Sequence, residues 1–220
     1  MVRKGRKLPP KNKLLVEGAE DKRVIPYLIE ANGVRWGESQ EEAIVFIEVC
    51  GSKTELLDKD GISTELQESG LSALGLIVDA DDKPKDTWQS IRNACSSIGD
   101  FPKNLPETGL IHNTNSGVKF GVWMMPDNKT CGMLETFLTY MIPDENEPIW
   151  NYAKTTVIEA KNLGAPFIGN HIYKANIHTW LAWQNPPGRQ LHNAVKEEIL
   201  NPKHPQAQIF INWFKKLYDL

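Results

Sequence analysis

Two short apolar runs that end in carboxylates constrain this chain most. They occupy residues 14–16 and 76–78, and each is soon followed by a pair of acidic side chains, which are Glu17, Asp21, Asp79 and Asp81. A wholly apolar strand is typical of a parallel sheet that helices cover on both faces. Functional groups gather at the carboxyl ends of such strands. We therefore expect the four carboxylates to share one edge of a parallel sheet.

Several carboxylates at one place favour a bound cation. Two like charges about 5 Å apart repel by roughly 3 kcal/mol at an effective dielectric constant near 20. Mg²⁺ prefers oxygen ligands and takes one or two protein carboxylates together with water and phosphate oxygens. The pattern predicts a metal-dependent enzyme that acts on phosphate groups. Taken singly, Glu17 could instead cap a turn and Asp21 a helix, so the prediction depends on the conjunction of the two pairs.

The rest of the chain alternates between expected strands and expected helices. The expected strands cover residues 13–17, 43–49, 74–78, 110–112 and 118–125. The expected helices cover residues 21–31, 86–98 and 133–141, with one or two short helices within 51–69. Pro26 would require the first helix to begin near Lys22, because proline is tolerated in a first turn. This order predicts right-handed crossovers and a mostly parallel α/β sheet flanked by helices.

Three segments are expected along the chain. Residues 1–12 are basic and form a tail, either a solvated one or an arm that touches a phosphate backbone. Residues 13–141 form the α/β core. Residues 142–220 form a helical extension packed on that core, with breaks at residues 164–166, 185–188 and 201–202, where glycine, proline and asparagine gather.

Composition limits where the protein works and what it binds. The formal net charge is −3, so any nucleic-acid contact must be local. Cys50, Cys95 and Cys131 form no Cys-x-x-Cys pair, which argues against a zinc ribbon and a disulfide framework and for a reducing compartment. No apolar stretch reaches the roughly 20 residues of a membrane helix. A cytoplasmic location is the expectation.

One short motif points to a different chemistry. Gly51, Ser52, Lys53 and Thr54 resemble the end of a phosphate-binding loop, but Phe46 stands where the leading glycine of that motif belongs. ATP hydrolysis at this loop is therefore not expected.

The acidic motifs resemble those of the Toprim fold. Glu17-Gly18-x-x-Asp21 follows one strand and Asp79-x-Asp81 a later one, as in the fold shared by topoisomerases, bacterial primases, recombination proteins and OLD (overcoming lysogenization defect) nucleases. The resemblance covers roughly residues 13–140. Gly132-Met133-Leu134-Glu135 after residues 124–128 makes the chain similar to small stand-alone Toprim proteins close to the OLD nucleases.

That resemblance implies a site and its residues. Two Mg²⁺ or Mn²⁺ ions would be held by a set of carboxylates, which are Glu17, Asp21, Asp79, Asp81 and Glu135. Lys174, in Tyr173-Lys174-Ala175-Asn176, matches the lysine that those nucleases carry beyond the sheet, and Glu17 and Lys174 would be the catalytic residues. The alternatives are a surface carboxylate for Glu135 and a solvated helix face for Lys174.

The implied function is hydrolysis of DNA phosphodiester bonds. Two metal ions about 3.5–4 Å apart suit that reaction, and a lysine supplies positive charge where negative charge develops. The resemblance further implies a separately encoded ABC-like ATPase partner and a role in phage defence, with RNA as substrate and a homodimer left open. The rival functions are a non-catalytic Toprim subunit that binds nucleic acid or the ATPase, and phosphoryl transfer on nucleotides or RNA.

Overall fold

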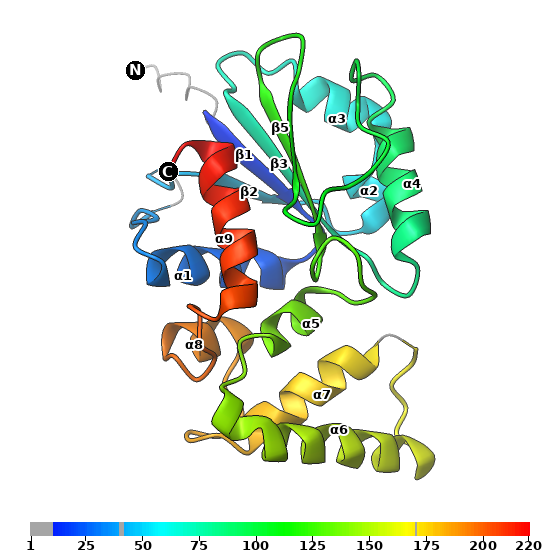
Figure 1. The fold of residues 1–220 in the computed structure, drawn as a ribbon, viewed down its shortest axis with the longest axis vertical. Helices are drawn as coiled ribbons and strands as arrows, with labels where there is room; N and C mark the ends of the chain where they lie inside the picture. The colour runs from blue at the N-terminus through cyan, green and yellow to red at the C-terminus, as the bar shows by residue number, and fades with distance from the viewer. Residues whose placement is uncertain (1–10, 40–41, 170) are drawn as a thin grey trace, which may run out of the picture.

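A five-stranded sheet with helices on both faces forms the upper part of the molecule in the view of Figure 1. The computed structural model describes residues 11–39, 42–169 and 171–220. The strand order is β2-β1-β3-β5-β4. The strands are β1 (Asn12–Val16), β2 (Phe46–Val49), β3 (Ala73–Asp79), β4 (Leu110–Asn113) and β5 (Lys119–Met125). All neighbours are parallel except β4 and β5, which form an antiparallel pair at one edge. The predicted mostly parallel α/β fold is confirmed.

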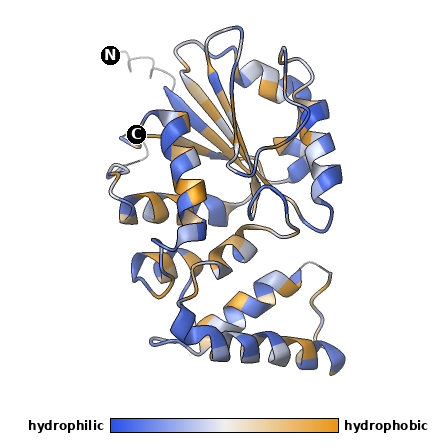
Figure 2. Cartoon of the chain, viewed as in Figure 1, coloured by the Kyte–Doolittle hydropathy of each residue, from blue (hydrophilic) through white to orange (hydrophobic). Residues whose placement is uncertain are grey.

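The apolar runs form the inner strands of this sheet. The first six residues of β3 and the last six of β5 are buried, and apolar residues run along the strands between largely polar outer helix faces (Figure 2). The strand expected over residues 43–49 begins only at Phe46. Its first residues bond elsewhere, since the Ile44 N–H donates to the Trp36 carbonyl and the Ile44 carbonyl accepts from the Asn12 side chain.

Helices cover the two faces of the sheet with separate hydrophobic clusters. On one face lie α2 (Lys53–Leu56), α3 (Lys59–Glu65) and α4 (Pro84–Ala94). On the other lie α1 (Ala19–Ala31) and α9 (Pro205–Tyr218). The remaining helices are α5 (Leu134–Thr139), a 3₁₀ turn at Asp144–Asn146, α6 (Glu147–Asn162), α7 (His171–Ala182) and α8 (Leu191–Lys196). The helix expected over residues 86–98 thus ends four residues earlier, with Cys95 as its C-cap.

The start of α1 corrects one prediction. The helix begins at Ala19 rather than near Lys22, so Pro26 lies inside it and not in its first turn. Proline in a helix interior removes a backbone hydrogen bond. The helix is retained because the side chains on either side of Pro26 are buried against the sheet, including Ile25, Leu28 and Ile29. Tertiary packing here outweighs local propensity.

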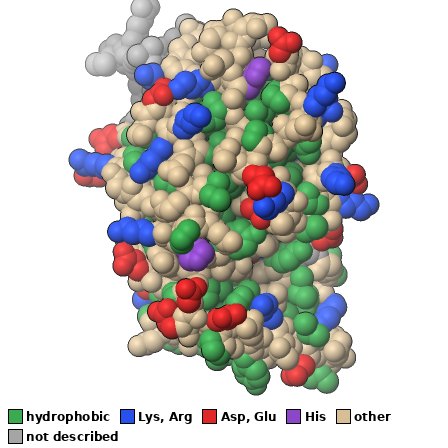
Figure 3. Space-filling view, in the orientation of Figure 1, with side chains coloured by type: hydrophobic (Ala, Val, Ile, Leu, Met, Phe, Trp, Pro, Cys, Tyr) green, Lys and Arg blue, Asp and Glu red, His purple; other side chains and the backbone are tan. Residues whose placement is uncertain are grey.

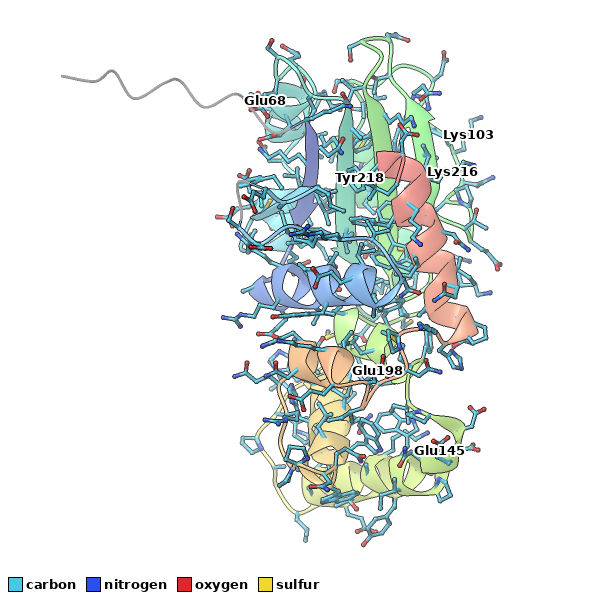
Figure 4. All side chains as sticks on the ribbon, turned by 90° about the vertical axis from the view of Figure 1, so that its left-hand side faces the viewer. Glu68, Lys103, Glu145, Glu198, Lys216 and Tyr218 are labelled. Carbon is cyan, nitrogen blue, oxygen red and sulfur yellow. The ribbon has the colours of Figure 1, made fainter. Side chains whose placement is uncertain are left out.

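The last helix returns to the sheet and joins its core. Gly75 of β3 and Gly121 of β5 are register partners. A Cβ atom at Gly121 would collide with Leu217 of α9, and a Cβ atom at Gly75 would collide with the Tyr218 hydroxyl of the same helix. The Tyr218 hydroxyl, at the sheet end of α9 (Figure 4), donates to the Lys13 carbonyl at 2.8 Å. One hydrophobic cluster runs from Leu14 to Tyr218. A boundary at residue 142 therefore separates residues that share a core.

The chain between β5 and α9 carries the expected helical breaks. Turns separate α6, α7, α8 and α9 at the three predicted places, and α6 and α7 pack against each other as a hairpin that meets α5. The expected tail falls mostly outside the described residues, which begin at 11, and Asn12 already belongs to β1. Among the described residues, none of the helices has the length and apolar character needed to cross a membrane.

Candidate active site

The site lies at the carboxyl edge of the parallel strands, where the sheet meets α1 and α5 (Figure 1). Glu17 directly follows β1 and Asp79 is the last residue of β3. These two strands are neighbours in register, with Val16 opposite Ile77. The apolar strands thus stop side by side and deliver their acidic residues to the same place, as the sequence predicts.

The turn from β1 into α1 positions Asp21. Gly18 is extended, with φ −118° and ψ 161°, and acts as the N-cap residue of α1. Its backbone N–H donates to Asp21 Oδ2 at 3.2 Å. Asp21 is buried in the first turn of the helix, where the helix dipole favours a negative charge by a few tenths of a kcal/mol. It is thus both a cap of α1 and a member of the acidic cluster.

The loop after β3 is tied to the loop before α5. Asp81 has a φ of 52°, and its backbone N–H and carbonyl each bond to Gly132 at 2.8 Å. The Leu134 N–H donates to Asp79 Oδ1 at 3.2 Å. These bonds bring the first turn of α5, with Glu135, to the end of β3.

Glu135 and Lys174 form an ion pair across the edge of the site. The Glu135 side chain is only 3% exposed, and the Lys174 Nζ lies 2.5 Å from its Oε1. A surface position for Glu135 is therefore excluded. Lys174 reaches the pair from α7, the second helix of the hairpin, with 45% of its side chain exposed. The lysine points to the carboxylate cluster rather than away from it.

Lys53 is a site residue that the sequence prediction missed. It is the first residue of α2, and its ammonium forms an ion pair with Asp81 Oδ2. Residues 51–54 were considered only as a phosphate-binding loop, and that interpretation was rejected. Their place in the sequence could nevertheless have predicted a site residue, because Lys53 follows β2 and the parallel strands of this sheet end at the same edge. That prediction would have required knowing that β2 lies beside β1, and the sequence does not reveal the order of the strands.

The pKa values of the acidic residues are raised by burial and by one another. Burial first, and then the charges of Glu135 and Glu17, raise the pKa of Asp21 to about 7, against hydrogen bonds that lower it. Burial also raises the pKa of Asp79, and the other four carboxylates raise it further. The other four carboxylates therefore lie within electrostatic reach of Asp79.

Two lysines act on the same cluster. Burial and the charge of Asp81 raise the pKa of Glu17, while the charges of Lys53 and Lys174 lower it. Burial alone would lower the pKa of Lys174, but its bond to Glu135 and the charges of Asp79 and Asp21 raise it. Glu17 thus lies within reach of both ammonium groups.

The donor set suits a hard divalent cation in its chemistry. Within residues 11–39, 42–169 and 171–220, no group of three His, Cys, Asp or Glu side chains is positioned to hold a metal ion. Ammonium groups lie on two of the five carboxylates. Glu17 Oε2 is buried without a hydrogen-bond partner, which is costly unless a cation or a donor supplies one. An all-oxygen set with unbalanced negative charge fits Mg²⁺ or Mn²⁺.

The profile of a protein family matches most of the chain. The profile of a family described as "Protein of unknown function (DUF3226)" matches residues 11–219. The match includes the sheet, the hairpin with Lys174, and α9. No curated protein and no solved structure matches the chain.

Proposed function

The chain belongs to the DUF3226 family, and we propose that it is a metal-dependent nuclease that hydrolyses the phosphodiester bonds of DNA. One observation carries the proposal. Five carboxylates, from the turn after β1, α1, the end of β3, the loop after β3, and α5, converge on one edge of the sheet together with Lys174. A fold gains nothing from concentrating buried negative charge in this way, whereas a site for divalent cations requires it.

The residues have separate tasks in the proposed reaction. The cations would be held by the carboxylates, namely Glu17, Asp21, Asp79, Asp81 and Glu135. Two bound Mg²⁺ or Mn²⁺ ions would supply the Lewis acidity with which a phosphodiester reacts with water at neutral pH.

Glu17 and Lys174 would act on the reacting groups themselves. By the resemblance to OLD nucleases, Glu17, which directly follows β1 in the acidic cluster, would accept a proton from the attacking water. The Lys174 ammonium, half exposed at the rim, would face the phosphate and stabilise the negative charge that develops on its oxygens. The buried Glu135 then serves to hold Lys174 in place before the substrate arrives.

The resemblance to OLD nucleases further suggests that the protein works with a separately encoded ABC-like ATPase. It also suggests a biological role in defence against phage. Both rest on the resemblance alone.

One observation favours a second candidate, a non-catalytic subunit that binds nucleic acid or the ATPase. Ion pairs with Lys53 and Lys174 satisfy Asp81 and Glu135 from within the chain, and a site closed in this way could be purely structural. The two candidates differ in whether the purified chain cleaves DNA.

A plasmid-nicking assay tests the proposal. Supercoiled plasmid is incubated with the purified protein in Mg²⁺ or Mn²⁺, beside Asp79→Ala and Asp82→Ala. Asp82 is an exposed neighbour of the site and serves as the matched control. We expect Asp79→Ala to lose at least about 100-fold in rate, as when one preorganised charge-stabilising group is removed, and Asp82→Ala to remain active. Cleavage by Asp79→Ala at the wild-type rate would refute the assignment.

A further inference from the structure

We propose that Lys53 alternates between two anionic partners: Asp81 in the metal-free chain and the phosphate backbone of the substrate once a cation occupies Asp81. This inference rests on the proposed function and extends it. It makes Lys53 a second phosphate-binding lysine, one that also competes with the cation for its ligand.

The backbone holds Lys53 beside the site through β1. After β2 ends, the Cys50 N–H donates to the Val16 carbonyl at 2.9 Å and the Gly51 N–H donates to the Glu17 carbonyl at 3.1 Å. Gly51 has a φ of 95°, which favours glycine at this turn. The chain then enters α2 through Ser52, whose hydroxyl accepts the Glu55 N–H at 3.2 Å. These backbone hydrogen bonds therefore hold Lys53 close to Glu17, the first carboxylate of the acidic cluster along the chain.

The side chain of Lys53 is placed for exchange between partners. Its ammonium forms an ion pair with Asp81, and 26% of its side chain is exposed, against 37% for Asp81. It also lowers the pKa of Glu17, so it faces two of the proposed ligands. A lysine ammonium is a compact charge on a flexible stem with three donors. Such a group can leave one oxygen anion for another nearby without a change in the backbone.

A divalent cation bound to Asp81 would displace the Lys53 ammonium from that carboxylate. It carries twice the charge of an ammonium, so it outcompetes Lys53 for the same carboxylate oxygen, and the freed ammonium then faces an acidic edge already neutralised by metal. A phosphate oxygen of the bound strand is the anion next available to it, and phosphates are the usual partners of lysine in nucleic-acid complexes.

The two lysines reach the edge from different elements. Lys53 comes from α2, which lies with α3 and α4 on one face of the sheet, and Lys174 comes from the hairpin beyond the edge (Figure 1). A strand of nucleic acid bound across the carboxylates would therefore meet an ammonium on each side of the scissile phosphate. On the face seen in Figure 3, acidic and basic side chains are interspersed, so local contacts rather than a broad field would hold the strand.

The test uses Lys53→Met and a matched control, Lys59→Met, which removes an exposed lysine at the start of α3. The first measurement is Mn²⁺ affinity by calorimetry without nucleic acid. We expect Lys53→Met to bind Mn²⁺ several-fold more tightly than the wild type, because the competing cation is gone, and Lys59→Met to match the wild type. Equal or weaker Mn²⁺ binding by Lys53→Met would overturn the proposal.

The second measurement is binding of a short DNA duplex in Ca²⁺ at several salt concentrations, by fluorescence anisotropy. We expect Lys53→Met to bind several-fold more weakly, with the salt slope reduced by about one counterion, and Lys53→Arg to retain binding. Unchanged DNA affinity in Lys53→Met would refute the exchange. If the wild type binds neither Mn²⁺ nor DNA, the proposed function fails. If it binds both and Lys53→Met behaves like Lys59→Met, only this inference fails. Circular dichroism verifies that each variant is folded.

Discussion

At the scale of single residues, the lysines decide how the acidic cluster behaves without metal. The Lys174 ammonium pairs with a carboxylate that is almost completely buried. Removing one partner of a fully buried ion pair costs about 3–5 kcal/mol, because the other charge is left without a partner. Half of Lys174 is exposed, so solvent screening reduces that cost.

Lys174→Met should therefore change both stability and catalysis. In the metal-free chain we expect a loss of about 1–3 kcal/mol in the free energy of unfolding, measured with urea. With metal bound, we expect kcat to fall while the affinity for DNA changes little, as for an interaction made mainly in the transition state. Lys154→Met on α6 is the control, since its ammonium contacts only the face of Trp150 among the contacts described. A stable Lys174→Met protein with normal kcat would exclude the assigned role.

The site residues differ in how they could be predicted from the sequence. Glu17, Asp21, Asp79 and Asp81 could be placed together because strand ends of a parallel sheet coincide. Glu135 and Lys174 came only from the resemblance, since nothing local to α5 or α7 indicates that they meet. Lys53 was missed because its position depends on which strand lies beside β1. Contacts between residues far apart in sequence are fixed by topology, which a single sequence shows poorly.

At the scale of elements, the strands and helical breaks were predictable and the docking of α9 was not. The spacing of apolar residues gives the face that a helix buries, but not the surface that covers it. That surface depends on Gly75 and Gly121, which leave room for Leu217 and the end of α9 on neighbouring strands. Isolated glycines in strand patterns indicate a close backbone approach, and this signal could have located the helix.

Gly121→Ala tests that close approach. The added methyl group meets the Leu217 side chain, and overpacking of this kind costs about 1–3 kcal/mol. Urea unfolding should show this loss. The double variant with Leu217→Ala should show coupling between the two positions, although the second change creates a cavity of its own. Gly99→Ala, at an exposed position where a Cβ meets only the end of the Asn115 side chain, should change stability by less than about 0.5 kcal/mol. Equal effects of the two glycine substitutions would mean that α9 is not seated as described.

At the scale of the whole molecule, the acidic edge lowers the stability of the fold near neutral pH. The pKa of Asp21 is about 7 in the folded chain, against an ordinary value of 3.8. Between these pH values the folded chain holds a proton that the unfolded chain has released. Stability therefore falls as the pH rises from about 4 to about 7, and the full cost is present above that range. The raised pKa values of Asp79 and Glu17 act in the same direction.

The melting temperature of metal-free protein should consequently be higher at pH 5 than at pH 8. A change of 1 kcal/mol moves the melting temperature of a domain of this size by about 2–4 °C. Asp21→Asn should reduce the difference between the two pH values, and the exposed Asp60→Asn should leave it unchanged. Saturating Mn²⁺ should raise the melting temperature of the wild type at pH 8, since a ligand of the folded state stabilises it. A wild-type melting temperature that rises from pH 5 to pH 8 without metal would contradict this account.

The glycine pair beneath α9 also bears on ancestry and on how other sequences are aligned with this one. Surface loops generally tolerate insertions and deletions, whereas a side chain at either position of the pair would collide with the final helix. A relative that keeps this architecture is expected to carry very small residues at the positions of Gly75 and Gly121, even where little else agrees. Finding the two together, one on each of two neighbouring strands, would identify distant members of the lineage that overall similarity misses.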